Sequence, residues 1–309
     1  MPQKILPVLR VLTVLICFFV IAAGNFFLPA PLFGSEGEPA GESEGEKETE
    51  LTLPENPFTR LTRDEKGQLD SFETSFVTYA SADGSRQVTL VAAIHIGEKQ
   101  YYRELNRRFQ DYDTVLFEMV GDGDPRPVSA RESGGLIGRI QRLSALLMRL
   151  EFQIGSINYH APNFVHADMT SEEFNAAMRR RRDGLLVWFL RTYGYEMTCR
   201  ETPNPEAEIL FLKLLVSPHK CQILRQLNAP GVADIRSTLI PVEGKHGSSL
   251  VADRNAKALQ ILQSELDSGK KNVAIFYGAA HLPGMAEKLQ TDFHLHPKKI
   301  EWLQCWKLQ

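Results

Sequence analysis

Two short apolar segments on either side of an amphipathic helix constrain the fold of this chain more than any other feature. Residues 87–94 (QVTLVAAI) and 114–119 (TVLFEM) are almost uninterrupted apolar and β-branched runs, typical of strands buried on both faces. Between them, apolar residues recur at the spacing of one helix face over 98–110. A strand, a helix and a strand of these lengths predict a βαβ unit with a parallel pair of strands.

The flanking segments extend this unit into one α/β domain. Residues 74–80 and 87–94 are predicted to form a β-hairpin around an Asp-Gly turn. Helical periodicity occurs in the middle of the chain at 129–152, 171–193, 205–226 and 248–267. The C-terminal part is predicted to add a strand at 272–277, a helix at 282–290 and a strand at 300–307. The architecture that accommodates these elements is α/β, a mixed, largely parallel central sheet flanked by helices, with a helical middle insertion.

Residues 1–30 predict export from the cytoplasm. The apolar run 11–28 follows Lys4 and Arg10 and precedes an acidic segment, which orients the C-terminal bulk outside the cytoplasm. A run of 18 residues is short for a spanning helix, and small residues at 22–24 offer a processing site. A cleaved signal peptide (secreted protein) and a retained anchor (membrane tether through 11–28) are both left open, and either makes the domain extracytoplasmic.

Residues 31–57 are predicted to be an acidic, flexible linker. Seven Glu and one Lys fall within 35–50, a composition typical of a solvated segment. The whole chain carries a net charge of −3, so the remaining domain, 58–309, is close to neutral. A neutral domain lacks the basic surface that nucleic-acid binding requires, and we expect no nucleic-acid partner.

The cysteines leave one question open. Cys199, Cys221 and Cys305 lack the spacing of a metal site. An oxidising compartment would permit a Cys199–Cys221 disulfide, but three buried thiols fit the sequence equally well.

Three of the predicted strands end in, or just before, a residue that can bind a metal or move a proton. These residues are His95, Glu118 and His281. Ligand sites in open α/β sheets lie beyond the carboxyl ends of the strands, so we expect the three side chains to converge. Two imidazoles and a carboxylate form an open site for a divalent ion, while without metal a His and Glu pair can serve as base and orienting group. Glu118 stands out, because an ionised carboxylate in an apolar strand is costly unless it is paired or metal-bound.

Four sequence pieces carry a more specific signal. In chain order they are 92–97 (AAIHIG), 112–118 (YDTVLFE), 253–256 (DRNA) and 277–284 (YGAAHLPG). This order resembles the TraB/PrgY/GumN/Tiki family, whose pattern is a GxxH, a carboxylate closing the next strand, an Arg-Asn pair on a late helix and a second GxxH. The first motif departs from the family in having Ala92 where Gly is usual, which makes the backbone there slightly less permissive.

The resemblance implies a TraB/Tiki-like α/β domain over 58–309 and a metal-dependent, peptidase-like hydrolase. Tiki members are described as peptidases that use manganese or cobalt, and TraB and PrgY members as membrane proteins that shut down peptide pheromone. By this resemblance His95, Glu118 and His281 would bind a divalent metal ion, manganese or cobalt. Arg254 would stabilise the carboxylate or a substrate oxyanion, so that Glu118 and Arg254 are the expected catalytic residues; a surface salt bridge is the alternative for Arg254.

Two other functions are left open. The first is a non-catalytic protein that sequesters a peptide or signal in the same strand-end cleft. The second is a helical interaction module, in which the apolar segments 185–190 and 209–216 form an oligomer interface. His166 is a weaker candidate ligand, and Asp168 is interpreted as part of the cap region of the helix that begins at Thr170–Ser171.

Overall fold

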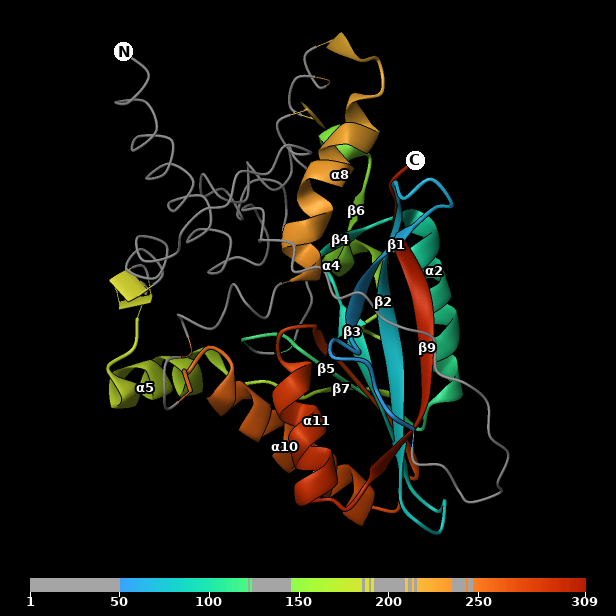
Figure 1. The fold of residues 1–309 in the computed structure, drawn as a ribbon. Helices are drawn as coiled ribbons and strands as arrows, with labels where there is room; N and C mark the ends of the chain where they lie inside the picture. Colours follow the sequence, from blue (N-terminus) through green and yellow to red (C-terminus); the bar gives the residue numbers. More distant parts are fainter. Residues whose placement is uncertain are drawn as a thin grey trace.

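Helices cover both faces of a central sheet, which confirms the predicted mixed α/β class (Figure 1). The computed structural model describes residues 51–121, 123, 146–184, 187, 188, 190, 191, 209, 210, 213, 216–234, 243 and 247–309. The predicted signal or anchor at 1–30, most of the linker and most of the helical insertion lie outside these residues. Among the described residues, no helix is long and apolar enough to cross a membrane.

The sheet has an antiparallel half and a parallel half. In the antiparallel half β2 (Leu69–Ala80) pairs with β1 (Thr59–Arg63), β3 (Gln87–Ala93) and β9 (His296–Lys307). The parallel half runs in the order β3–β8–β5–β7, with β8 (Asn272–Gly278), β5 (Thr114–Phe117) and β7 (Phe164–His166). A separate two-stranded ladder joins β4 (Ile96–Gly97) to β6 (Glu151–Phe152).

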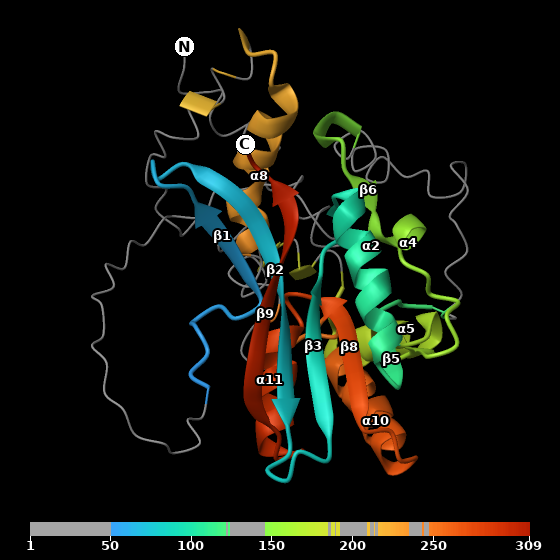
Figure 2. The same cartoon turned by 90° about the vertical axis from the view of Figure 1, so that its right-hand side faces the viewer.

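Two apolar cores lie on opposite faces of the sheet. Helix α2 (Lys99–Arg108) packs on one face, in a core that also includes Ala229 of α8 (Lys220–Ala233). Helices α10 (Ala252–Asp267) and α11 (Leu282–Thr291) pack on the other face, away from α2 (Figures 1 and 2). Successive residues of β8 alternate between the two cores, so the strand must be apolar on both faces.

The predicted hairpin and the helix 98–110 are confirmed as β2–β3 and α2. The predicted pairing of the strands at 87–94 and 114–119 is wrong. These strands, β3 and β5, are parallel, but β8 lies between them and pairs with both. The reason is that β8 comes from the C-terminal part of the chain and supplies two hydrogen-bonding edges, which local sequence spacing does not reveal.

Several predicted helix boundaries are also wrong. The helix expected at 171–193 is interrupted, because α5 (Ser171–Arg181) ends where Arg182 adopts a left-handed conformation with φ of 54°, and the described residues 187, 188, 190 and 191 are helical again. The helix expected at 205–226 is interrupted, because the described residues 209, 210, 213 and 216 are helical, residues 217–219 are not, and α8 then runs from Lys220 to Ala233. The last two residues of the helix predicted at 129–152 form β6, because they pair with β4. The elements expected at 248–267, 272–277 and 282–290 are present as α10, β8 and α11, and the last strand, β9, begins at His296 instead of 300.

Helix α5 begins with a complete capping box. The Thr170 hydroxyl accepts from the Glu173 backbone N–H at 3.1 Å, and the Glu173 carboxylate accepts from the Thr170 N–H at 2.9 Å. Thr170→Ala is therefore expected to lower the free energy of unfolding by about 1 kcal/mol in chemical denaturation. Glu172→Ala, in the same turn but outside the box, should lower it by only about 0.3–0.5 kcal/mol. Equal losses for the two variants would contradict this account of the cap.

Candidate functional site

The carboxyl ends of the four parallel strands bring ionisable residues to one edge of the sheet. His95 follows β3 by two residues, Glu118 follows β5 directly and Asp168 follows β7 by two residues. His281 follows β8 and caps the start of α11. Arg254, in the first turn of α10, lies among them. The residues form one electrostatic cluster, because His95, His281 and Arg254 all act on the charge of Glu118.

Arg254 is the centre of this cluster. Its Nε and Nη2 atoms donate to the two carboxylate oxygens of Asp168 at 2.9 and 2.5 Å, and Nη2 also donates to Glu118 Oε1 at 2.6 Å. The side chains of Arg254 and Asp168 are 8% and 0% exposed, so both charges are withdrawn from water. The two carboxylates raise the pKa of Arg254 above its usual range, although burial alone would lower it.

Glu118 is held from two sides. Besides Arg254, the backbone N–H of Gly278 donates to its Oε2 atom at 2.7 Å. A Cβ atom on Gly278 would lie 3.2 Å from the same oxygen, so the glycine allows the close approach. Burial alone would raise the pKa of Glu118, but Arg254 and the two histidines hold that pKa well below its usual range. The carboxylate is therefore ionised at neutral pH.

His281 is buried and neutral. Its Nε2 atom lies 3.5 Å from Glu118 Oε1 and 3.4 Å from Arg254 Nη1. The ring of Tyr277 packs edge-on against it, with a centroid separation of 5.3 Å. Burial, which disfavours the charged ring, lowers the pKa of His281 to about 4, with Arg254 adding to the effect and Glu118 opposing it.

His95 is the exposed member of the cluster. Its backbone carbonyl accepts from the N–H of Gln153, which ties the end of β3 to α4 (Gln153–Ser156). Its imidazole is close enough to Glu118 and His281 for their charges to interact. Of the residues in the cluster, His95 is therefore the one most open to solvent.

Asp168 binds Arg254 and Asn255 binds His281, and the sequence indicated neither contact. The interpretation of Asp168 as part of a helix cap is wrong, because Thr170 is the N-cap and Asp168 binds Arg254. A signal was present, since Asp168 follows β7, but three residues are too short a strand for periodicity to detect. His166, a weaker candidate ligand, instead directs its Nε2 atom at the Met119 carbonyl, 2.6 Å away.

The residues fit a metal ion only in part. His281 Nε2 and Glu118 Oε1 lie 3.5 Å apart, a separation that two ligands of one ion can have, but the guanidinium of Arg254 already contacts both atoms, at 3.4 and 2.6 Å. Within the described residues, no three His, Cys, Asp or Glu side chains are grouped as a complete set of ligands. A third ligand would require a side chain to move, and His95, which is exposed and electrostatically coupled to Glu118, is a candidate.

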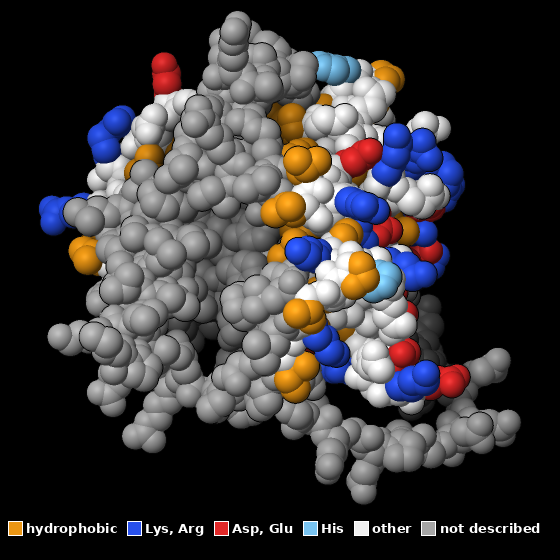
Figure 3. All heavy atoms as spheres, turned by 90° about the horizontal axis from the view of Figure 1, so that it is seen from above, with side chains coloured by type: hydrophobic (Ala, Val, Ile, Leu, Met, Phe, Trp, Pro, Cys, Tyr) orange, Lys and Arg blue, Asp and Glu red, His pale blue; other side chains and the backbone are white. Residues whose placement is uncertain are grey.

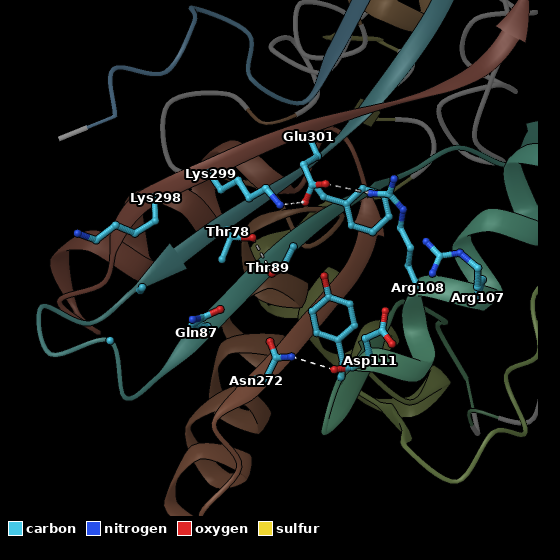
Figure 4. Close-up of a pocket in the computed structure, with 14 residues that line it drawn as sticks. Thr78, Gln87, Thr89, Arg107, Arg108, Asp111, Asn272, Lys298, Lys299 and Glu301 are labelled. Carbon is cyan, nitrogen blue, oxygen red and sulfur yellow. Dashed lines mark hydrogen bonds and ion pairs between the residues drawn. The ribbon is translucent and has the colours of Figure 1, made fainter. Parts of the chain in front are cut away.

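A hollow of about 610 Å³ lies at the opposite edge of the sheet, where β3 and β8 begin (Figure 4). Basic side chains surround it, but Arg107 and Arg108 are paired with Glu104, and Lys299 with Glu301. None of its lining residues carries a buried polar atom without a partner. The ionisable cluster at the carboxyl edge is therefore the better candidate for a working site.

The surface seen from above mixes side chains of every kind (Figure 3). On the described part of this face, Lys and Arg side chains are interspersed with acidic and hydrophobic ones. This face therefore has no continuous basic surface in its described part, in keeping with the near-neutral charge of the domain.

The fold and the site define an α/β protein with an ionisable cluster at the carboxyl ends of its parallel strands. No protein-family model matches the chain, and no curated protein matches it. The geometry of the cluster and the sequence motifs around it are therefore the grounds for a functional proposal.

Proposed function

We propose that this chain is a metal-dependent hydrolase of the TraB/Tiki type, peptidase-like and acting outside the cytoplasm. The observation that carries the proposal is the charge of the buried cluster. Glu118 and Asp168 share the single positive charge of Arg254, and the neutral His281 adds none. A buried charge without compensation costs several kcal/mol, so the cluster favours a bound cation.

Each residue of the cluster would have a separate role in binding the ion and activating water. His281 and Glu118 would hold a divalent ion, manganese or cobalt by the resemblance, and His95 would complete the set from the solvent side. Such an ion acidifies a bound water and polarises a carbonyl oxygen. Glu118, ionised and fixed by Arg254 and Gly278, would supply the negative charge that binds the ion and orients its bound water.

Arg254 is better suited to position Glu118 than to bind substrate. Its Nε and Nη2 atoms are occupied by Asp168 and Glu118, and Nη1 reaches the carbonyl of Leu250 and the ring of His281. Of the two roles expected for Arg254, stabilising the carboxylate therefore has the support of these contacts.

The sequence motifs support the same proposal. The GxxH at 278–281, the carboxylate at 118 and the Arg-Asn pair at 254–255 all contribute side chains or backbone to this one cluster. A peptide or another small amide or ester is the substrate class that fits the resemblance, and the predicted export at 1–30 would place the activity outside the cytoplasm.

The test is metal binding by the full chain. We expect the purified, EDTA-treated protein to bind one manganese or cobalt ion in calorimetric titration, and mixed peptides to be hydrolysed only with metal present. His281→Ala and His95→Ala should each weaken metal binding by at least about 10–100-fold, because even partners outside the ligand set contribute that much.

His294→Asn is the matched control. His294 is exposed and lies just before β9, at the far end of the sheet, and asparagine tolerates its positive φ of 56°. This variant should bind metal like the unmodified protein. Absence of metal binding by the unmodified protein would overturn the proposal, and metal or peptide binding without hydrolysis would favour the sequestering function instead.

A further inference from the structure

Asn255 makes two hydrogen bonds to the same residue, His281. Its Nδ2 atom donates to the backbone carbonyl of His281 at 2.9 Å, and its Oδ1 atom lies 2.6 Å from the ring atom Nδ1. Asn255 is buried and comes directly after Arg254 on α10. One side chain therefore fixes both the backbone and the ring of His281.

The first of these bonds decides the orientation of the amide. A backbone carbonyl oxygen can only accept, so the NH₂ group of Asn255 must face it, and Oδ1 must face the ring. The space around the amide is tight, since a Cβ atom on Gly284 would lie 3.2 Å from Nδ2. The amide therefore has one satisfied orientation.

The second bond then decides where the proton on the ring lies. The amide oxygen Oδ1 can only accept, so the bond to the ring requires a proton on Nδ1. We infer that Asn255 holds the neutral His281 ring as the Nδ1–H tautomer, with the lone pair of Nε2 directed toward Glu118 and Arg254. The Nη1 atom of Arg254, at 3.4 Å, is a donor that matches this lone pair.

This tautomer is the one that the cluster can use. A lone pair on Nε2 can bind a metal ion or accept a proton, whereas an Nε2–H can do neither. That use rests on the proposed function, but the tautomer itself does not. Asn255 is thus a positioning residue, which acts through His281 and touches no reacting atom.

Nitrogen-15 NMR of the full chain, with labelled histidine and without metal, tests the inference. The Nδ1 atom of His281, assigned from the loss of its signals in His281→Gln, should show the shift of a protonated nitrogen, and Nε2 that of an unprotonated one. Asn255→Leu should move both shifts toward the average of two exchanging tautomers, while Asn255→Asp, which keeps an acceptor at the ring, should preserve the protonated Nδ1. Asn255→Leu should also weaken manganese binding by about 10–100-fold.

An Nε2–H signal in the unmodified protein would overturn the inference, and so would unchanged shifts in Asn255→Leu. The first of these outcomes needs no variant, so the result does not depend on how well Asn255→Leu folds. The experiments can also overturn the inferred tautomer and the proposed function independently of each other. The Nδ1–H tautomer in a protein that binds no metal would leave the inference standing and remove the hydrolase.

Discussion

Replacing Arg254 with methionine is expected to lower the free energy of unfolding by about 3–5 kcal/mol. The substitution leaves Asp168 and Glu118 buried without their shared cation. Their side chains are 0% and 17% exposed, so water can replace little of what the guanidinium supplied. Urea denaturation at neutral pH, followed by circular dichroism, measures the loss.

Arg181→Met is the matched control. Arg181 also makes a two-pronged contact, with Asp253 at 2.7 and 2.6 Å, but its side chain is 28% exposed. Because solvent screens this pair, the expected loss is at most about 1 kcal/mol. Adding Asp168→Asn to Arg254→Met should recover part of the loss, since it removes one buried charge. Equal losses in Arg254→Met and Arg181→Met would show that burial of the cluster does not govern its energetics.

Acid should destabilise the metal-free protein through His281. Its pKa is lowered from 6.5 to about 4 in the folded state, so between these values the unfolded chain binds a proton that the folded chain does not. Stability contributed by His281 is complete above pH 6.5 and falls as the pH drops toward 4, by about 3 kcal/mol. Glu118, whose pKa is also lowered on folding, adds a further loss below its ordinary value of 4.5.

Free energies of unfolding measured at pH steps from 7 to 4, in EDTA, check this slope. His281→Gln has no imidazole to titrate, so its stability should change less between pH 6.5 and 4.5 even if it is lower throughout. A slope as steep as that of the unmodified protein would mean that other groups cause the acid sensitivity.

The sequence predicted the local elements of the fold better than their order in the sheet. The hairpin, α2 and the apolar runs of β3, β5 and β8 follow from turn residues and periodicity. The position of β8 between β3 and β5 does not, because it depends on pairing between residues 185 and 159 positions apart in the chain, and such non-local pairing leaves no local trace in the sequence. The strand β7 was missed because it has only three residues, and β1 (TRLTR) because Leu61 is its single apolar residue.

For the site, residue chemistry pointed to His95, Glu118, Arg254 and His281, whereas the role of Asp168 and the contacts between these residues came only from the structure. An ionisable residue at the end of an apolar strand is visible in sequence, as for His95 and Glu118. The bond from Arg254 to Asp168 is not visible, because it joins the start of a helix to the end of a three-residue strand 86 positions away. The pairing explains how two carboxylates can be buried next to each other.

The positions of β8 and β9 in the sheet also determine when the sheet can form during synthesis of the chain. Both strands come from the last 40 residues, yet β8 completes the middle of the sheet and β9 pairs with β2 from Ser71 to Ala80. As the chain emerges from the ribosome, β3 and β5 have no strand to join them until β8 is made. Folding of this sheet must therefore wait for the C-terminus, and non-local pairing of this kind is intrinsically slow. The delay would leave the facing edges of β3 and β5 without a partner until synthesis of the chain is nearly complete.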